Sequence, residues 1–262
     1  MKIKFQDQPS LHKKISKKLI EVFKKKLIKS DFILGNDVKA FESNFAKYCN
    51  TKYAVGVSNG TDALNLALKT LNLKKNDEVI IPAMTYVATA LSVVYNDCKL
   101  RLCDINLDDG LIDIDQLKKN INKKTKCIII VNFNGNYVHL KELSKVVPKK
   151  IKIIFDASQS HGCGENGVRA NSDAFISCYS LYPGKNLGAL GDAGVITTNN
   201  YLIYKKILKL RNIGSSKKFI HDEIGFNNRL DTIQAAFLNI KLQNLDKQNN
   251  ARKKNASYLN QN

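Results

Sequence analysis

Between residues 53 and 198 the chain alternates short apolar runs with helical patterns, and this alternation restricts its fold more than any other feature. The apolar runs are YAVGV, EVIIP, KLRLCDI, CIIIVNF, IKIIFDA, AFISCYS and GVITT. Stretches with helical periodicity separate the first five of them: TDALNLALKTL, TYVATALSVVY, IDQLKKNI and HLKELSKVV. This rhythm is typical of βαβ units. It predicts a three-layer α/β/α sandwich with a mainly parallel central sheet.

Both ends of the chain carry further helical patterns. Apolar residues recur every four positions from Leu11 to Leu27, with lysines mostly on the other face, which predicts one amphipathic helix. A DNA-binding role for this helix is the alternative to a solvated lysine face, but the segment has no arginine. Helices are also predicted after Gly35 and over residues 202–210, and one long helix runs from Thr232 almost to the last residue.

Composition places the chain among folded proteins. Its 262 residues correspond to one large domain or two unequal ones at about 150 residues per domain. Hydrophobic residues make up 44% and charged residues 25%, which argues against a disordered chain, a collagen or a coiled-coil rod. The 42 basic and 23 acidic residues give a net charge of +19. This charge favours an anionic partner without choosing among a nucleotide, a nucleic acid and an acidic membrane surface.

The cysteines show no C-x-x-C pair, and most of them lie inside apolar runs, so we interpret them as reduced core thiols and expect no metal site. The six are Cys49, Cys98, Cys103, Cys127, Cys163 and Cys178. The N-terminal residues lack the apolar region of a signal peptide, and no apolar stretch approaches the roughly 18 residues of a membrane span. The expected location is the cytoplasm.

Four places directly after apolar runs carry candidate functional residues, because open α/β sheets bind ligands at the carboxyl ends of their strands. In SNGTDAL, Gly60 and Thr61 stand at a helix N-terminus suited to a phosphate, although a plain turn capped by Thr61 explains them equally well. Asp156 ends the run IKIIFD, where a carboxylate needs a cation opposite it. Its alternative role is the cap of a turn.

The other two places contribute an amine and an aromatic ring. Lys185 in SLYPGKNLG is either a surface lysine or a Schiff-base amine whose pKa is lowered by burial. Tyr86 in PAMTYVATAL is either a core residue or a plate on which a flat ring stacks. A phosphate site, a stacking ring, a carboxylate and an amine together match the requirements of pyridoxal phosphate.

The sequence also resembles the DegT/DnrJ/EryC1/StrS sugar aminotransferases, which have pyridoxal-phosphate fold type I. The resemblance extends over nearly the whole chain, with the motifs in the same order. The motifs are DFILGNDVKAFESNFAKY, SNGTDALNLAL, NDEVIIPAMTYVATA, FDASQSHG, YPGKNLGALGDAG, GFNNRLDTIQAAFL and ARKKNASYL.

The resemblance implies specific roles for individual residues. Lys185 would be the Schiff-base lysine and Asp156 the partner of the ring nitrogen, and both would be catalytic. The implied cofactor-binding residues are Gly60, Thr61, Tyr86, Asp156, Gln159, Ser180, Lys185 and Asn227. Tyr86 would stack on the ring, and Gln159 would approach its 3-oxygen. The residues implied at the phosphate are Gly60, Thr61, Ser180 and, for the cofactor of the neighbouring subunit, Asn227.

The resemblance further implies the reaction and its partners. A pyridoxal-phosphate aminotransferase of this kind moves an amino group from L-glutamate to a nucleotide-linked keto-sugar, here a dTDP-3-keto-6-deoxyhexose, for amino sugars of surface polysaccharides. Family members are homodimers with shared active sites, so a homodimer is expected here. No nucleic acid or membrane partner is expected. Lys185 would take up and return the proton during the transfer.

Two departures from the family pattern lead to further expectations. Asn132 in VNFNG stands where the family usually has a histidine, which bears on substrate contacts. Family members also continue beyond the last helix into a small C-terminal domain. We therefore expect residues 1–231 to form the large cofactor-binding domain and residues 232–262 a helix leading into a truncated small domain.

Three other functions remain open at this stage. One is a sugar dehydratase of the same family, although dehydratases carry histidine in place of the lysine, so Lys185 argues against it. Another is an inactive truncated protein. The last is a basic binding protein that shares only the fold, for which we would expect salt-sensitive DNA binding and no bound chromophore.

Overall fold

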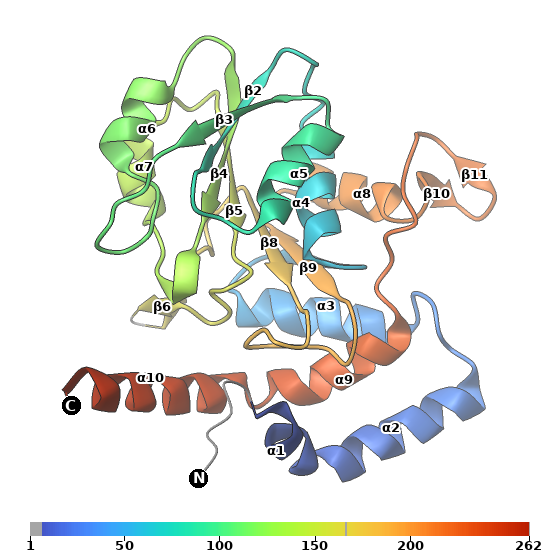
Figure 1. Cartoon of the computed structure of the whole chain (residues 1–262). Helices are drawn as coiled ribbons and strands as arrows, with labels where there is room; N and C mark the ends of the chain where they lie inside the picture. The colour runs from blue at the N-terminus through green and yellow to red at the C-terminus, as the bar shows by residue number, and fades with distance from the viewer. Residues whose placement is uncertain (1–6, 166, 262) are drawn as a thin grey trace.

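The computed structural model describes residues 7–165 and 167–261, and its centre is a seven-stranded sheet (Figure 1). The strands are β1 (Tyr53–Val57), β2 (Glu78–Pro82), β3 (Lys99–Cys103), β4 (Thr125–Val131), β5 (Lys152–Asp156), β8 (Ile176–Ser180) and β9 (Gly194–Thr198). Their spatial order is β1-β9-β8-β5-β4-β2-β3. Two small hairpins, β6 (Gly164–Glu165) with β7 (Val168–Arg169) and β10 (Ser215–Lys217) with β11 (Ile220–His221), lie outside the sheet.

The predicted parallel sheet is confirmed, with one strand as an exception. The neighbours from β3 through β2, β4 and β5 to β8 pair in parallel. Strand β9 runs antiparallel to both β8 and β1. The chain returns from β8 to β9 through the loop 181–193, without the crossover helix that a parallel pair needs. That loop carries Lys185.

Helices cover both faces of the sheet, as the alternation of patterns predicts. On one face lie α4 (Gly60–Lys69), α5 (Val87–Tyr95) and α8 (Tyr201–Leu210), and their apolar residues share a core with Cys127 and Ile129 of β4. On the other face α6 (Ile114–Asn120) and α7 (Leu140–Val146) pack against Ile128 and Ile130 of the same strand. Beside them, α3 (Asn36–Tyr48) and α9 (Thr232–Leu242) form a third core cluster.

The prediction of one continuous helix over residues 11–27 is wrong, because the segment forms two helices. The structure has α1 (Gln8–Lys13) and α2 (Ser16–Lys29), separated where Ile15 leaves the helical conformation. The bend lets α1 approach the loop 181–193, where Gln8 donates a hydrogen bond to the Pro183 carbonyl. Leu19 is buried, but Leu27 is exposed.

The predicted long helix from Thr232 is also broken. It consists of α9 and α10 (Leu245–Gln261), with a turn at residues 243–244 in which the Asn244 amide donates to the Lys241 carbonyl at 3.1 Å. The turn allows Leu245 to enter the core, where it is 1% exposed. From there α10 extends past the edge of the domain (Figure 1).

The cysteines are free thiols, as predicted, and four of the six are buried. Burial raises the pKa of the Cys49 thiol to about 12. Throughout residues 7–165 and 167–261, the helices are too short or too polar to cross a membrane.

A buried ion pair joins α3, the end of α8 and the edge strand β1. Arg211 forms an ion pair with Glu42, and both side chains are buried. The Arg211 guanidinium also donates to the Gly56 carbonyl at 2.6 Å, while Glu42 accepts a hydrogen bond from the Gly56 amide at 2.8 Å. We expect Arg211→Met to lower the free energy of unfolding by about 3–5 kcal/mol, because Glu42 would stay buried without its cation. Urea unfolding followed by circular dichroism measures this change.

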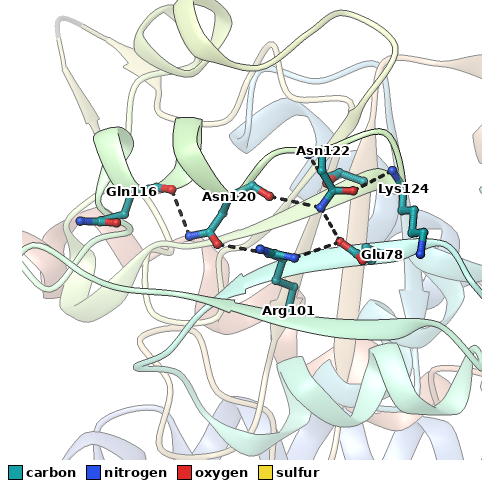
Figure 2. Close-up of polar contacts among 7 residues, drawn as sticks. Glu78, Arg101, Gln116, Asn120, Asn122 and Lys124 are labelled. Atoms are coloured by element: carbon teal, nitrogen blue, oxygen red, sulfur yellow. Dashed lines mark hydrogen bonds and ion pairs between the residues drawn. The ribbon is translucent and has the colours of Figure 1, made fainter.

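Arg101→Met is the matched control. Arg101 belongs to a polar network at the amino end of β2, where Figure 2 shows it between Glu78 and Asn120. Its guanidinium lies 3.5 Å from Glu78 and its side chain is 42% exposed, so its loss should cost less than about 1 kcal/mol. If Arg211→Met and Arg101→Met lowered the free energy of unfolding equally, the buried ion pair would stabilise the fold no more than the exposed one.

Candidate functional site

The predicted site residues follow the carboxyl ends of strands that run in the same direction. Gly60 and Thr61 come after β1, Tyr86 after β2 and Gln159 after β5. The other residues at this edge are Asp156 and Ser180, which end β5 and β8, and Lys185 in the loop after β8. Seven of the eight predicted site residues therefore lie at or after the carboxyl ends of these strands. The eighth, Asn227, lies between β11 and α9.

The carboxylate of Asp156 is buried and hydrogen-bonded from two elements. The residue is 6% exposed. Its Oδ2 accepts a hydrogen bond from the Thr89 hydroxyl of α5 at 2.9 Å, and its Oδ1 accepts one from the Ser158 amide at 3.2 Å. The bond from the Ser158 amide is the one expected if Asp156 only caps a turn. The bond from Thr89 does not belong to a turn, and it points the carboxylate toward α5.

Tyr86 directly precedes α5, the helix whose Thr89 bonds this carboxylate. Its carbonyl accepts the Thr89 amide at 3.0 Å, so the residue that bonds Asp156 lies one helical turn away. The Tyr86 side chain is 72% exposed, which excludes the core interpretation. Its ring is available to stack on a flat molecule.

Lys185 is half-buried in the loop 181–193 and lines a cavity of about 800 Å³ together with Ser158 and Gln159. Burial lowers the pKa of the Lys185 amine, and the negative charge of Asp156 opposes this shift. The structure gives Nζ no hydrogen bond or ion pair with any residue that it describes. A desolvated amine of this kind is a better nucleophile than a surface lysine.

Gly60 and Ser180 are in close contact at the N-terminus of α4. A Cβ atom on Gly60 would lie 2.6 Å from the Ser180 Cβ, so only glycine permits this approach. Asn59 caps the helix by accepting the Asp62 amide at 2.8 Å, whereas Thr61, the predicted alternative cap, lies inside the first turn. The hydroxyl oxygen of Ser180 accepts the Tyr182 amide at 3.3 Å, which leaves its proton to donate to an anion.

Gln159 and Asn227 occupy different positions relative to Lys185. The Oε1 atom of Gln159 accepts the Asn134 amide at 2.7 Å, which makes its Nε2 a hydrogen-bond donor at the cavity that Lys185 lines. Asn227 instead lines a separate cavity of about 450 Å³ with Asn59 and Arg229. Within one chain the structure does not bring Asn227 to Lys185.

The sequence interpretation did not single out two side chains that the structure places at the site, Thr89 and His161. Thr89 fixes Asp156, and its only signal was its place in the first turn after Tyr86. His161 is 1% exposed, with both ring nitrogens unpartnered among the described residues. Its pKa is lowered to about 3 by burial first and then by the charge of Lys185, although the Ser180 backbone acts in the opposite direction. His161 follows Gln159 by two residues within FDASQSHG, which was its available signal.

Asn132, the departure from the family pattern, lies below the cavity surface. It is fully buried, and its Nδ2 atom donates to Ser160 at 3.1 Å and to Asn171 at 3.3 Å. The backbone amide of Asn132 donates to the Asp156 carbonyl at 3.0 Å. The residue therefore supports the strand that carries Asp156, and the neighbouring Asn134 lines the cavity.

Comparison with known proteins gives consistent similarities. The family model described as the DegT/DnrJ/EryC1/StrS aminotransferase family matches residues 13–262. The chain is 38% identical over 257 residues to dTDP-3-amino-3,6-dideoxy-alpha-D-galactopyranose transaminase of Aneurinibacillus thermoaerophilus, covering 98% of this chain and 71% of that protein. It is 36% identical over 222 residues to dTDP-3-amino-3,4,6-trideoxy-alpha-D-glucose transaminase of Streptomyces venezuelae, covering 84% of this chain and 59% of that protein.

Solved structures share the fold. A crystal structure of S. venezuelae DesV superposes with a TM-score of 0.91 at 33% identity, covering 94% of this chain and 66% of that one. NtdA from Bacillus subtilis, solved with bound cofactor PMP, superposes with a TM-score of 0.85 at 29% identity, covering 90% of this chain and 55% of that one. The chain thus spans 55% to 71% of the length of these four proteins.

Proposed function

This chain belongs to the DegT/DnrJ/EryC1/StrS aminotransferase family, and we propose that it acts as a pyridoxal-phosphate-dependent nucleotide-sugar aminotransferase with Lys185 as the lysine that bonds the cofactor. The observation that carries this proposal is the half-buried Lys185 amine, whose pKa burial lowers and whose charge interacts with buried Asp156. A buried amine with a lowered pKa is suited to bond the cofactor's aldehyde, and a buried carboxylate is suited to the ring nitrogen.

The residues present fit this cofactor. The contact between Gly60 and Ser180 leaves a helix N-terminus with free amides and a hydroxyl donor, which suits a phosphate dianion. Asp156 is a carboxylate held by two hydrogen bonds, and Gln159 presents an amide donor. A solved structure that this chain resembles, that of NtdA, contains bound cofactor PMP.

Pyridoxal phosphate, when bound, supplies an aldehyde that bonds an amine and a ring that accepts electrons. Lys185 Nζ gives up its proton to become that amine, and burial favours this because it lowers the pKa. With the cofactor bound, the Lys185 amine would be the group that takes a proton from the amino donor and delivers it during the transfer. Asp156 would hold a proton on the ring nitrogen by its charge, and Thr89 keeps the carboxylate in place.

The proposed substrates are L-glutamate and a dTDP-linked keto-sugar. The support is that the two relatives described above are transaminases of dTDP-amino sugars. The amino sugar formed would be used in surface polysaccharides, and the protein would work in the cytoplasm. The dehydratase alternative is disfavoured because Lys185 is present at the position where family dehydratases have histidine.

A homodimer with shared sites is part of the proposal. Asn227 lines a cavity separate from the one that Lys185 lines, and in the proposal it binds the phosphate of the cofactor in a second subunit. Exposed apolar residues occur at both ends of α5, including Val87, Val94 and Tyr95. Exposed apolar side chains gathered on one element are typical of an interface.

The proposed function is tested by its half-reactions. After incubation with pyridoxal phosphate, L-glutamate should remove the visible absorbance, and a dTDP-3-keto-6-deoxyhexose should restore it. D-glutamate is the control and should leave the absorbance unchanged. Absorbance that persists with L-glutamate would contradict the aminotransferase assignment, and loss without recovery would contradict the keto-sugar as acceptor.

A further inference from the structure

The loop that carries Lys185 is held in place by helices from both ends of the chain. Gln8 of α1 donates to the Pro183 carbonyl. Gln234 of α9 accepts the Leu190 amide at 2.9 Å. These contacts attach the loop to its surroundings but do not reach the loop that follows Asp156.

Asn249 of α10 contacts both loops. Its Oδ1 accepts a hydrogen bond from Asn186 Nδ2 at 2.9 Å, next to Lys185 in the sequence. Its Nδ2 donates to the His161 carbonyl at 2.8 Å, in the loop that begins at Asp156. Among the hydrogen bonds of the described residues, those of Asn249 are the ones that connect segments 182–190 and 157–163 through a single side chain.

The first turn of α10 gives Asn249 a rigid base. Leu245 is buried, and Asp246 pairs with Arg169 at 3.0 Å. The Tyr48 hydroxyl donates to the same carboxylate at 2.6 Å. Beyond Asn249, the described α10 residues 250–261 are exposed. Asn249 is therefore the last residue of α10 that is partly buried among those that the structure describes.

The spacing of the two loops determines the surroundings of the lysine amine. His161, whose carbonyl Asn249 holds, has its ring buried close enough to Lys185 for the Lys185 charge to lower the pKa of the imidazole. Asp156 interacts with Lys185 from the start of the same loop. If the loops separated, water would reach the amine and both interactions would weaken.

We propose that Asn249 is a positioning residue, whose amide fixes the Lys185 loop relative to the loop that begins at Asp156. This inference rests on the proposed role of Lys185 as the cofactor lysine. It also means that a displacement of α10 reaches Lys185 through Asn249. The bound cofactor is not needed to observe this effect, because the hydrogen bonds are made by the chain itself.

The test compares Asn249→Ala with Asn250→Ala in the cofactor-free protein. Asn250 lines the same cavity one position along α10, and the structure shows no hydrogen bond from its side chain to any residue that it describes. Alanine favours a helix more than asparagine does, so neither change should weaken α10. The measurements are the pH dependence of amine labelling at Lys185 by mass spectrometry and backbone hydrogen exchange over residues 182–190.

For Asn249→Ala we expect the labelling midpoint of Lys185 to rise toward that of an ordinary lysine, because the amine gains solvent. Exchange over 182–190 should accelerate about tenfold or more, since two hydrogen bonds are lost. Asn250→Ala should match the unaltered protein in both measurements. Asn249→Asp, which keeps the acceptor for Asn186 but not the donor to His161, should also accelerate exchange.

Unchanged labelling and exchange in Asn249→Ala would overturn the proposal, and so would an equal change in Asn250→Ala. The melting temperature of each variant is recorded alongside, because a merely structural residue would lower it without moving the Lys185 midpoint. Failure of the proposed function is seen separately, as the absence of cofactor on Lys185 in the unaltered protein.

Discussion

Replacing Lys185 with alanine should abolish the covalent attachment of pyridoxal phosphate and slow the glutamate half-reaction by at least about 10⁴-fold. Two contributions are lost together, since the amine both bonds the cofactor and moves the proton. Alanine leaves the loop backbone intact, because the hydrogen bond from the residue 185 amide to the Tyr182 carbonyl does not involve the side chain. The measurement is the rate at which L-glutamate changes the absorbance of the cofactor-loaded variant.

Lys241→Ala is the control for this substitution. Lys241 is also partly buried, and burial lowers its pKa to about 8. Its Nζ faces His12 at 3.3 Å, however, and no charge of Asp156 acts on it. A low pKa without the neighbouring carboxylate should not support the chemistry, so this variant should keep the rate of the unaltered protein. Comparable losses in both variants would show that Lys185 has no special role.

The second large effect is expected for Asp156→Asn. Asparagine keeps the size of the side chain and can still accept the Thr89 hydroxyl, but it carries no charge to hold a proton on the ring nitrogen. Loss of such an electrostatic contribution should slow the half-reaction by about 10²–10³-fold. The circular dichroism spectrum should not change.

Asp113→Asn provides the comparison for Asp156. Asp113 accepts the Asp115 and Gln116 amides at the start of α6, away from Lys185, and asparagine caps helices equally well. Its half-reaction rate should equal that of the unaltered protein. If Asp156→Asn also retained that rate, Asp156 would be only a turn residue, as its bond from the Ser158 amide allows.

Much of the fold is predictable because each inner strand carries apolar residues on both faces. The run CIIIV of β4 supplies Cys127 and Ile129 to one core and Ile128 and Ile130 to the other, and that pattern predicts a sheet covered on both sides. The direction of β9 was not predictable from its own residues, because strand direction depends on the loop before it.

The helix breaks were not predictable because periodicity continues across them. Ile15 belongs to the apolar repeat of the N-terminal segment, yet its backbone leaves the helix where α1 turns toward the Lys185 loop. Leu245 likewise fits the long C-terminal pattern, and only its entry into the core near α3 requires the turn before it. Tertiary contacts override the local pattern in both cases.

The residues of the candidate site were likewise predictable only in part. The positions of Asp156 and Lys185 after strands of the sheet were predictable from the apolar runs that precede them, whereas their roles stay predictions. Thr89 and Asn249 were not predictable, because a threonine or an asparagine on a helix has many ordinary roles. Only the fold shows that Thr89 bonds Asp156 and that Asn249 bonds the loops that contain Asn186 and His161.

Borohydride trapping tests the central claim most directly. The protein is incubated with pyridoxal phosphate, reduced with borohydride, digested and examined by mass spectrometry for the peptide that carries the added mass. The expected result is that the reduced cofactor is found on Lys185, with the other lysines unlabelled at equimolar cofactor. Label on Lys241 or spread over surface lysines, or no label with excess cofactor, would contradict the assignment of Lys185.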